Sequence, residues 1–241
     1  MNIKEIEEFK KRVLYEDNHI IVINKNPSEI VQRDKTGDES LTDTVKEFIK
    51  YRDNKKGNVY LGLPHRIDRP TSGIVVFAKT DKALSRLSQM FKDGGVAKTY
   101  LALTDSRFEK DKDTLCDYLR KDEEQNKSFK SNEGDKRAKK AVLEYEYIGS
   151  TQRYFLYKVR LYTGRHHQIR CQFSLRGVHI KGDLKYGAKR SNSDASICLH
   201  SYRVSFTHPV SGKYIDVVCY PSWSGLSSLY EKLSVSKLTE E

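Results

Sequence analysis

Hydrophobic positions along the chain follow two spacings, one typical of helices and one typical of strands. Apolar residues three or four positions apart predict helices over residues 1–12, after Ser40, after Thr80 and after Gly164. Alternating or short continuous apolar runs predict strands over residues 13–15, 20–23, 74–78, 98–104, 141–148, 154–162, 197–206 and 214–220. Many strands, short turns and few helices predict the α+β class, with a mixed, mainly antiparallel sheet flanked by helices.

The chain is predicted to form one domain over residues 1–241, because neither a repeat nor a proline- or serine-rich linker divides it. Two small halves that meet at a cleft fit the same pattern. Residues 1–12 would be an N-terminal helical extension, and residues 225–241 a C-terminal tail or helix. Residues 121–140 are nearly all charged, polar or glycine, so we expect them to bury nothing and to form a mobile loop or hairpin tip.

Charge narrows the class of partner. The chain has 44 Lys and Arg against 33 Asp and Glu, a net charge of +11, which attracts polyanions and nucleic acid above all. No apolar run approaches the roughly 20 residues that a membrane-spanning helix needs, and the charged N-terminus lacks the apolar core of a signal peptide. The cysteines form no CxxC pair, which is typical of reduced thiols. We expect a cytoplasmic protein that does not bind membranes.

The segment 64–73, PHRIDRPTSG, places a single carboxylate between two cations. Asp68 is flanked by Arg66 and Arg69 and braced by prolines and glycine just before an apolar strand. A nearby arginine favours the ionised carboxylate and cannot give up its own proton. No second acid stands beside Asp68, so the pattern suits a lone nucleophile or a lone base rather than a carboxylate pair.

A second cationic cluster, TGRHHQIR, spans residues 163–170. Arg165 is predicted to open a helix, where its charge opposes the helix dipole, and Asp68 is a candidate for the compensating partner. His166 and His167 are adjacent, so on a helix they would diverge rather than bind one ion. Together with the lack of any other ligand spacing, this predicts that the chain binds no metal.

Tyr100 lies on a strand whose alternation places it opposite Leu101 and Leu103. If those leucines are buried, Tyr100 is free to line a cleft and to stack on a base. A serine or cysteine hydrolase is disfavoured, because the chain has no GxSxG and no cysteine at a convincing helix N-terminus.

Several of these segments together resemble the RluA-type pseudouridine synthases. Residues 65–73 are similar to the HRLDRxTSG signature of that family, and residues 163–170 to its TGRxHQIR motif. Residues 98–102 resemble its KxYLA strand, and Leu199-His200 with His208-Pro209 its C-terminal hairpin. The order holds from about residue 13 to residue 220. Because only about a dozen residues precede the first strand, the chain resembles a catalytic-domain-only member without an S4 domain.

The resemblance implies the pseudouridine synthase fold with a central active-site cleft, and an isomerase that converts uridine to pseudouridine in RNA without cofactor or metal. Asp68 would be the essential carboxylate, as nucleophile or base, with Arg165 as its partner and Tyr100 against the flipped uracil. Arg66 would fill the gap that the nucleotide leaves in the RNA stack. The remaining implied roles are RNA binding by Lys98, His167 and Arg170, and loop support by Arg69, Thr71 and Gly73.

The partner implied is structured RNA, either tRNA or rRNA, with no DNA, and the default oligomeric state is a monomer. An alternative reading is a non-catalytic RNA-binding or RNA-chaperone protein on the same fold. A metal-dependent nuclease is a third reading. The intact set of Asp68, Arg66, Tyr100 and Arg165 argues against pure binding, since a carboxylate repels phosphate.

Overall fold

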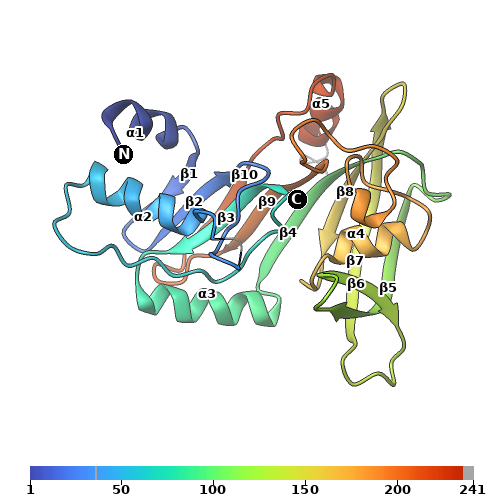
Figure 1. Cartoon of the computed structure of the whole chain (residues 1–241), viewed down its shortest axis with the longest axis horizontal. Helices are drawn as coiled ribbons and strands as arrows, with labels where there is room; N and C mark the ends of the chain where they lie inside the picture. The colour runs from blue at the N-terminus through green and yellow to red at the C-terminus, as the bar shows by residue number, and fades with distance from the viewer. Residues whose placement is uncertain (36, 236–241) are drawn as a thin grey trace. The chain divides into compact units, whose positions relative to one another are not determined.

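Figure 1 shows the computed structural model of the chain, which describes residues 1–35 and 37–235. The chain divides into two units. Unit 1 consists of residues 1–97 and 201–219, and unit 2 of residues 98–200 and 220 onward. The predicted single domain over residues 1–241 stays a prediction.

A mainly antiparallel sheet forms the centre of unit 1. Its strands are β1 Val13–Glu16, β2 Ile20–Lys25, β3 Ser72–Ala78, β9 Leu199–Thr207 and β10 Tyr214–Val218. They run in the order β1-β2-β3-β9, with β10 paired to β9. β2 and β3 pair from Ile20 opposite Ala78 to Lys25 opposite Gly73. This register places the end of β2 directly beside the start of β3, where the Asp68 segment enters the sheet.

Each helix of unit 1 is preceded by a residue whose side chain accepts a hydrogen bond from a backbone N–H of the first turn. The helices are α1 Ile3–Lys10, α2 Leu41–Arg52 and α3 Asp81–Asp93. Asn2 and Ser40 close capping boxes at α1 and α2, while Thr80 caps α3, as its position in the sequence predicts. The α3 residues Ala83 and Leu87 join a buried cluster with β2 and β3. α1 meets α2 through Phe9 and Phe48, whose ring centroids are 4.9 Å apart.

Unit 2 holds a second antiparallel run of strands. They are β4 Val96–Thr104, β5 Lys112–Asp122, β6 Lys127–Ser131, β7 Lys139–Ser150 and β8 Phe155–Leu161, in the order β4-β8-β7-β5-β6. The helices of this unit are α4 Gln168–Ser174, the 3₁₀ turn Leu184–Tyr186 and α5 Ser227–Val235. An aromatic cluster of Phe108, Tyr145, Tyr157 and Phe173 packs α4 onto the sheet through stacked and edge-on rings. The predicted α+β class with a mainly antiparallel sheet is confirmed.

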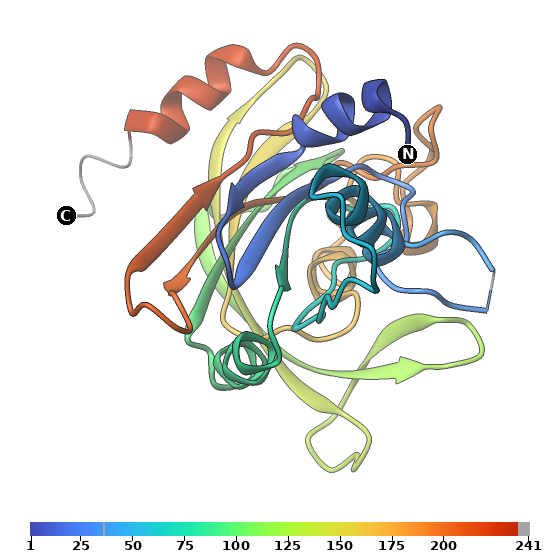
Figure 2. The ribbon, with the colours of Figure 1, turned by 90° about the vertical axis from the view of Figure 1, so that its left-hand side faces the viewer.

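The segment 121–140 departs from the expected loop that buries nothing. β6 lies within it and pairs with β5 as a hairpin, light green in Figure 2. Ser128 on β6 is only 2% exposed. Its backbone N–H donates to the Tyr186 hydroxyl and its Oγ donates to the backbone oxygen of His166. Partners distant in sequence therefore bury a strand whose own composition is polar. The hairpin-tip alternative fits residues 123–126.

Candidate active site

Asp68 lies in a turn that enters β3. The Thr71 N–H donates to the Asp68 backbone oxygen at 3.0 Å, which closes the turn. Ile67 is 7% exposed and anchors the turn in the core, whereas Arg66 is exposed and Asp68 is half-buried. At the start of the segment, His65 Nε2 accepts the Val76 N–H at 2.9 Å. The backbone around the carboxylate is thus fixed while the carboxylate keeps access to solvent.

Lys25 stabilises this turn through hydrogen bonds to backbone oxygens, a role that the sequence alone did not reveal. Its side chain is fully buried at the end of β2. Its Nζ donates to the backbone oxygens of Asn26 and Glu29 at 2.8 Å and of Arg69 at 3.0 Å. Burial lowers the pKa of Lys25 to about 7, against the opposing effect of the Glu29 and Asp68 carboxylates. The detectable signal is a lysine that ends an apolar strand immediately before the turn residues Asn26 and Pro27.

Arg69 and Thr71 occupy the other side of the turn. The Arg69 guanidinium pairs with Asp38 at 2.7 Å and donates from Nε to the Ser28 backbone oxygen at 3.1 Å. The Ser28 N–H in turn donates to the Arg69 oxygen at 2.9 Å. Thr71 is 1% exposed. The contacts of Arg69 with Asp38 and Ser28 tie the Asp68 turn to the segment that follows β2.

Gly73, the second residue of β3, follows the turn at a position that tolerates no side chain. Its φ is +105°, and a Cβ there would lie 2.4 Å from the Ser201 oxygen and 2.7 Å from the Ser201 nitrogen. We expect Gly73→Ala to lower the free energy of unfolding by about 2 kcal/mol or more, because backbone strain adds to a clash with a neighbouring strand. Urea unfolding measures this loss.

Gly212→Ala is the matched control for Gly73→Ala. Gly212 also has a positive φ, +72°, but a Cβ there meets nothing within 4 Å. Its substitution should cost only the conformational strain of about 1 kcal/mol. Equal losses for the two variants would contradict the packing explanation for Gly73.

In unit 2, Arg165 lies in a loop that ends at α4. The predicted helix start is corrected: α4 begins at Gln168, so Arg165 precedes the helix by three residues. The Gln168 side chain, 3% exposed, accepts from the Arg165 N–H at 3.0 Å and from Thr163 Oγ1 at 2.7 Å. Its Nε2 donates to the Val142 oxygen at 3.1 Å, which fastens the loop to β7.

The Arg165 side chain is exposed and lines a hollow of about 790 Å³, called here the Arg165 hollow. Its Nε donates to the Lys140 backbone oxygen at 2.8 Å, and this hydrogen bond restricts the orientation of the guanidinium. Cations outnumber carboxylates in the lining, which includes Arg120, Lys121, Arg137, Lys139 and Arg165 with Asp122, Glu123 and Glu124. Such a surplus of positive charge in a concave surface attracts phosphate.

Lys98 and Tyr100 lie on β4. Burial, and the nearby Arg165, lower the pKa of Lys98. Tyr100 pairs with Val159 of β8 and is 9% exposed, while Leu101 and Ala102 are fully buried. Both faces of β4 are therefore covered here. Burial on this strand does not alternate, and the lining of a cleft by Tyr100 stays a prediction.

His166 and His167 are stacked, with ring centroids 3.7 Å apart. The expectation that adjacent histidines diverge is wrong, because His167 adopts the left-handed conformation, φ 50°, before the helix begins. His167 Nδ1 lies 3.0 Å from the Tyr186 hydroxyl, and His166 lies within hydrogen-bond distance of Asn126 and Ser128. Within the described ranges, no group of three or more His, Cys, Asp or Glu residues is placed to hold a metal ion.

Arg170 is buried rather than presented to solvent. It is 5% exposed and forms a two-point ion pair with Asp183, Nε to Oδ2 at 2.7 Å and Nη2 to Oδ1 at 2.8 Å. The guanidinium also lies over the Tyr186 ring, 5.0 Å from its centroid. Its donors are directed into the protein, where they join α4 to the 3₁₀ turn.

The predicted site residues thus form one group in each unit. In unit 1 the group occupies the Asp68 turn and the start of β3, and consists of Arg66, Asp68, Arg69, Thr71 and Gly73. In unit 2 it consists of Lys98, Tyr100, Arg165, His167 and Arg170. Among the helices of the described residues, none is long and apolar enough to cross a membrane.

The fold is that of pseudouridylate synthases. The solved structure of human RNA pseudouridylate synthase domain containing 4 matches with a TM-score of 0.76 at 21% identity, covering 96% of each chain. The human domain-containing 1 protein matches with a TM-score of 0.68 at 19% identity, over 95% of this chain and 94% of that one.

Sequence comparison then gives the family. The model of the family described as RNA pseudouridylate synthase matches residues 19–175. The chain belongs to this family, whose members are isomerases that act on uridine in RNA.

Curated relatives carry the same family name. Ribosomal large subunit pseudouridine synthase D of Zymomonas mobilis is 31% identical over 85% of this chain and 67% of its own length. The D enzyme of Borreliella burgdorferi is 31% identical over 80% of this chain and 60% of its own. An uncharacterised RNA pseudouridine synthase of Mycoplasma genitalium is 33% identical over 85% and 66%. The chain therefore spans about 60–67% of the length of these relatives.

Proposed function

We propose that this chain isomerises uridine to pseudouridine in structured RNA, with ribosomal RNA as the first candidate and transfer RNA as the second. The observation that carries the proposal is the Asp68 turn. It holds one half-buried carboxylate on a backbone that Lys25 and Thr71 fix in place. The names of the relatives from Zymomonas mobilis and Borreliella burgdorferi support the ribosomal substrate.

The reaction needs no external atoms. The N1–C1′ bond of the uridine breaks, the uracil turns, and C5 bonds to C1′, after which C5 loses its proton and N1 gains one. In the proposal Asp68 is essential, as nucleophile at the sugar or as base at C2′. Arg165 keeps Asp68 ionised as its partner, and Tyr100 lies against the uracil. No cofactor takes part.

The target base must leave its stack before it reacts, at a cost of a few kcal/mol. Arg66 is exposed beside Asp68 and has the planar guanidinium to fill the gap that remains. Phosphate contacts in the Arg165 hollow offset the cost of extrusion. We propose that Arg170 and His167 position the loop that carries Arg165 and do not touch RNA, because both side chains are buried.

A direct assay tests the proposal. The purified chain is incubated with ribosomal RNA transcripts, and with transfer RNA in parallel, in excess chelator. New carbodiimide-dependent stops in primer extension mark pseudouridine, and we expect them at defined uridines. RNA binding with no stops in any substrate would favour the non-catalytic RNA-binding alternative. Loss of activity in chelator would favour a metal-dependent reaction. We further expect a monomer that acts in the cytoplasm and leaves DNA unmodified.

A further inference from the structure

A second large hollow lies in unit 2, and none of the residues assigned to catalysis lines it. We call it the Trp223 hollow. It has a volume of about 940 Å³ and lies between the β7–β8 turn, the loop 190–198 and the segment before α5. It shares no lining residue with the Arg165 hollow. Nothing in the proposed reaction uses it.

Positive charge predominates in this hollow. Arg153, Lys181 and Arg190 line it, against the single carboxylate of Asp194. Asp194 is engaged locally, since its Oδ1 accepts the Ser196 N–H at 3.1 Å and the Ser196 hydroxyl at 2.6 Å. The guanidinium-bearing residues Arg153 and Arg190 are exposed. A group that carries two negative charges would balance the lining.

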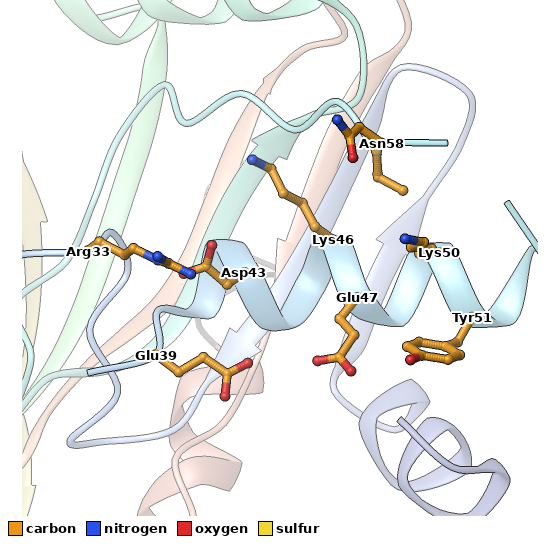
Figure 3. A pocket seen from close by; sticks show the side chains of 9 residues that line it. Arg33, Glu39, Asp43, Lys46, Glu47, Lys50, Tyr51 and Asn58 are labelled. Carbon is orange, nitrogen blue, oxygen red and sulfur yellow. The ribbon is translucent and has the colours of Figure 1, made fainter. Parts of the chain in front are cut away.

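A hollow of different character on unit 1 shows that this surplus is not general. The hollow beside α2, about 530 Å³, is lined by Arg33, Lys46 and Lys50 together with Glu39, Asp43 and Glu47 (Figure 3). Its cations and carboxylates are equal in number, and Arg33 pairs with Asp43 at 2.8 Å.

Aromatic rings accompany the cations of the Trp223 hollow. Tyr154 and Trp223 line it, and both are half-buried, so part of each side chain is accessible. Lys181 Nζ lies 5.4 Å from the centroid of the Tyr154 ring, which holds that ring in place. The Trp223 ring meets His200 edge-on at 6.3 Å. Partly accessible aromatic rings beside arginines are the chemistry that binds unpaired nucleotides, whose bases stack while their phosphates pair with cations.

The Trp223 hollow and the Arg165 hollow lie beyond opposite ends of β8. Tyr154 precedes β8 and Gly164 follows it closely, and the strand has seven residues. At about 3.3 Å per residue the strand spans roughly 23 Å. A ligand that contacts both hollows must therefore be long, equivalent to roughly seven steps of 3.4 Å along a nucleic acid strand.

We infer that the Trp223 hollow is a second RNA-contact site, which takes unpaired nucleotides of the substrate RNA at a distance from the target uridine. Phosphates contact Arg153 and Arg190, and a base stacks on Trp223. The inference rests on the proposed function and extends it, because it makes the length and the unpaired flank of the RNA determinants of substrate choice.

Trp223 is the only tryptophan of the chain, so its fluorescence reports this hollow directly. The protein is titrated with a ribosomal RNA hairpin that has an unpaired flank, and with a trinucleotide centred on uridine. We expect the hairpin to quench Trp223 and the trinucleotide to leave its fluorescence unchanged. Quenching by the trinucleotide, or by uridine monophosphate, would instead indicate a free-nucleotide site and overturn the inference.

Charge removal provides the second measurement. We expect the double variant Arg153→Gln, Arg190→Gln to bind the hairpin about tenfold more weakly, with the slope of log affinity against log salt smaller by about 1.4, since two phosphate contacts are lost. Its kcat should hold while KM rises. The control is Lys46→Gln, Lys50→Gln beside α2, which removes the same charge from the hollow in Figure 3.

The outcomes separate the two proposals. Wild-type affinity and slope in the Arg153, Arg190 variant, with no quenching of Trp223, would overturn the inference even if pseudouridine forms normally. Equal losses in both double variants would also overturn it, because they would reflect net charge alone. Absence of pseudouridine formation by the wild-type chain, with quenching intact, would overturn the proposed function and leave the second contact site standing.

Discussion

Asp68→Asn is expected to abolish pseudouridine formation while RNA binding persists. Asparagine keeps the size and the hydrogen-bonding oxygen of the side chain, but it is neither a nucleophile nor a base at neutral pH. Loss of such a group reduces kcat by about 10⁴-fold or more. RNA affinity should stay the same or rise slightly, since a carboxylate near phosphates is removed. Primer extension after carbodiimide treatment measures turnover, and a filter assay measures binding.

Asp216→Asn is the control for this experiment. Asp216 lies on β10 of the same unit and forms a partly exposed pair with Arg203 at 2.7 Å. This variant should retain full activity. Turnover by Asp68→Asn at a rate near that of the wild-type chain would remove Asp68 from the reaction and, with it, the proposed mechanism.

Arg170→Met should destabilise the protein strongly rather than weaken RNA binding alone. The substitution leaves Asp183, 1% exposed, as a buried carboxylate without its ion-pair partner. Breaking a buried pair on one side costs about 3–5 kcal/mol. Urea unfolding followed by the fluorescence of Trp223, which belongs to the same unit, measures the loss.

Two further variants show whether the loss of stability in Arg170→Met comes from the buried ion pair. Arg203→Met breaks a pair of which each side chain is about 30% exposed, and it should cost about 1 kcal/mol or less. In the double variant Arg170→Met, Asp183→Asn, part of the stability should return, because no charge is left buried. Wild-type stability of Arg170→Met with weakened RNA binding would show that this side chain contacts RNA, as the sequence resemblance implies.

The continuous apolar strands were predictable from sequence, and the polar strands were not. β2 and β3 have nearly fully buried side chains on both faces, so their composition identifies them. β5 was missed, because Asp117 occupies its buried face. That carboxylate is compatible with burial only because Gln172 donates to it at 2.7 Å and Arg176 at 2.8 Å. Both partners lie more than fifty residues further along the chain, where no local pattern reveals them.

Residue types in the sequence marked the candidate site, but they did not reveal the contacts that hold its residues in place. An acid between arginines marked Asp68, and the second cationic motif marked Arg165. The acceptors of Lys25 are backbone oxygens, which have no sequence signature. The stacked histidines depend on the left-handed conformation of His167, which is uncommon for any residue other than glycine. The physical obstacle in each case is that backbone geometry, rather than side-chain identity, decides the contact.

The β5–β6 hairpin is attached to the loop that carries Arg165. Ser128 and Asn126 hold His166, the immediate neighbour of Arg165. A displacement of the hairpin would therefore also move the loop that carries Arg165, so under the proposed function a contact of RNA with the hairpin would act on the arginine loop. The contacts with His166 come from positions 126 and 128, so we expect substitutions at the charged tip, residues 123–125, to leave the attachment of this loop intact.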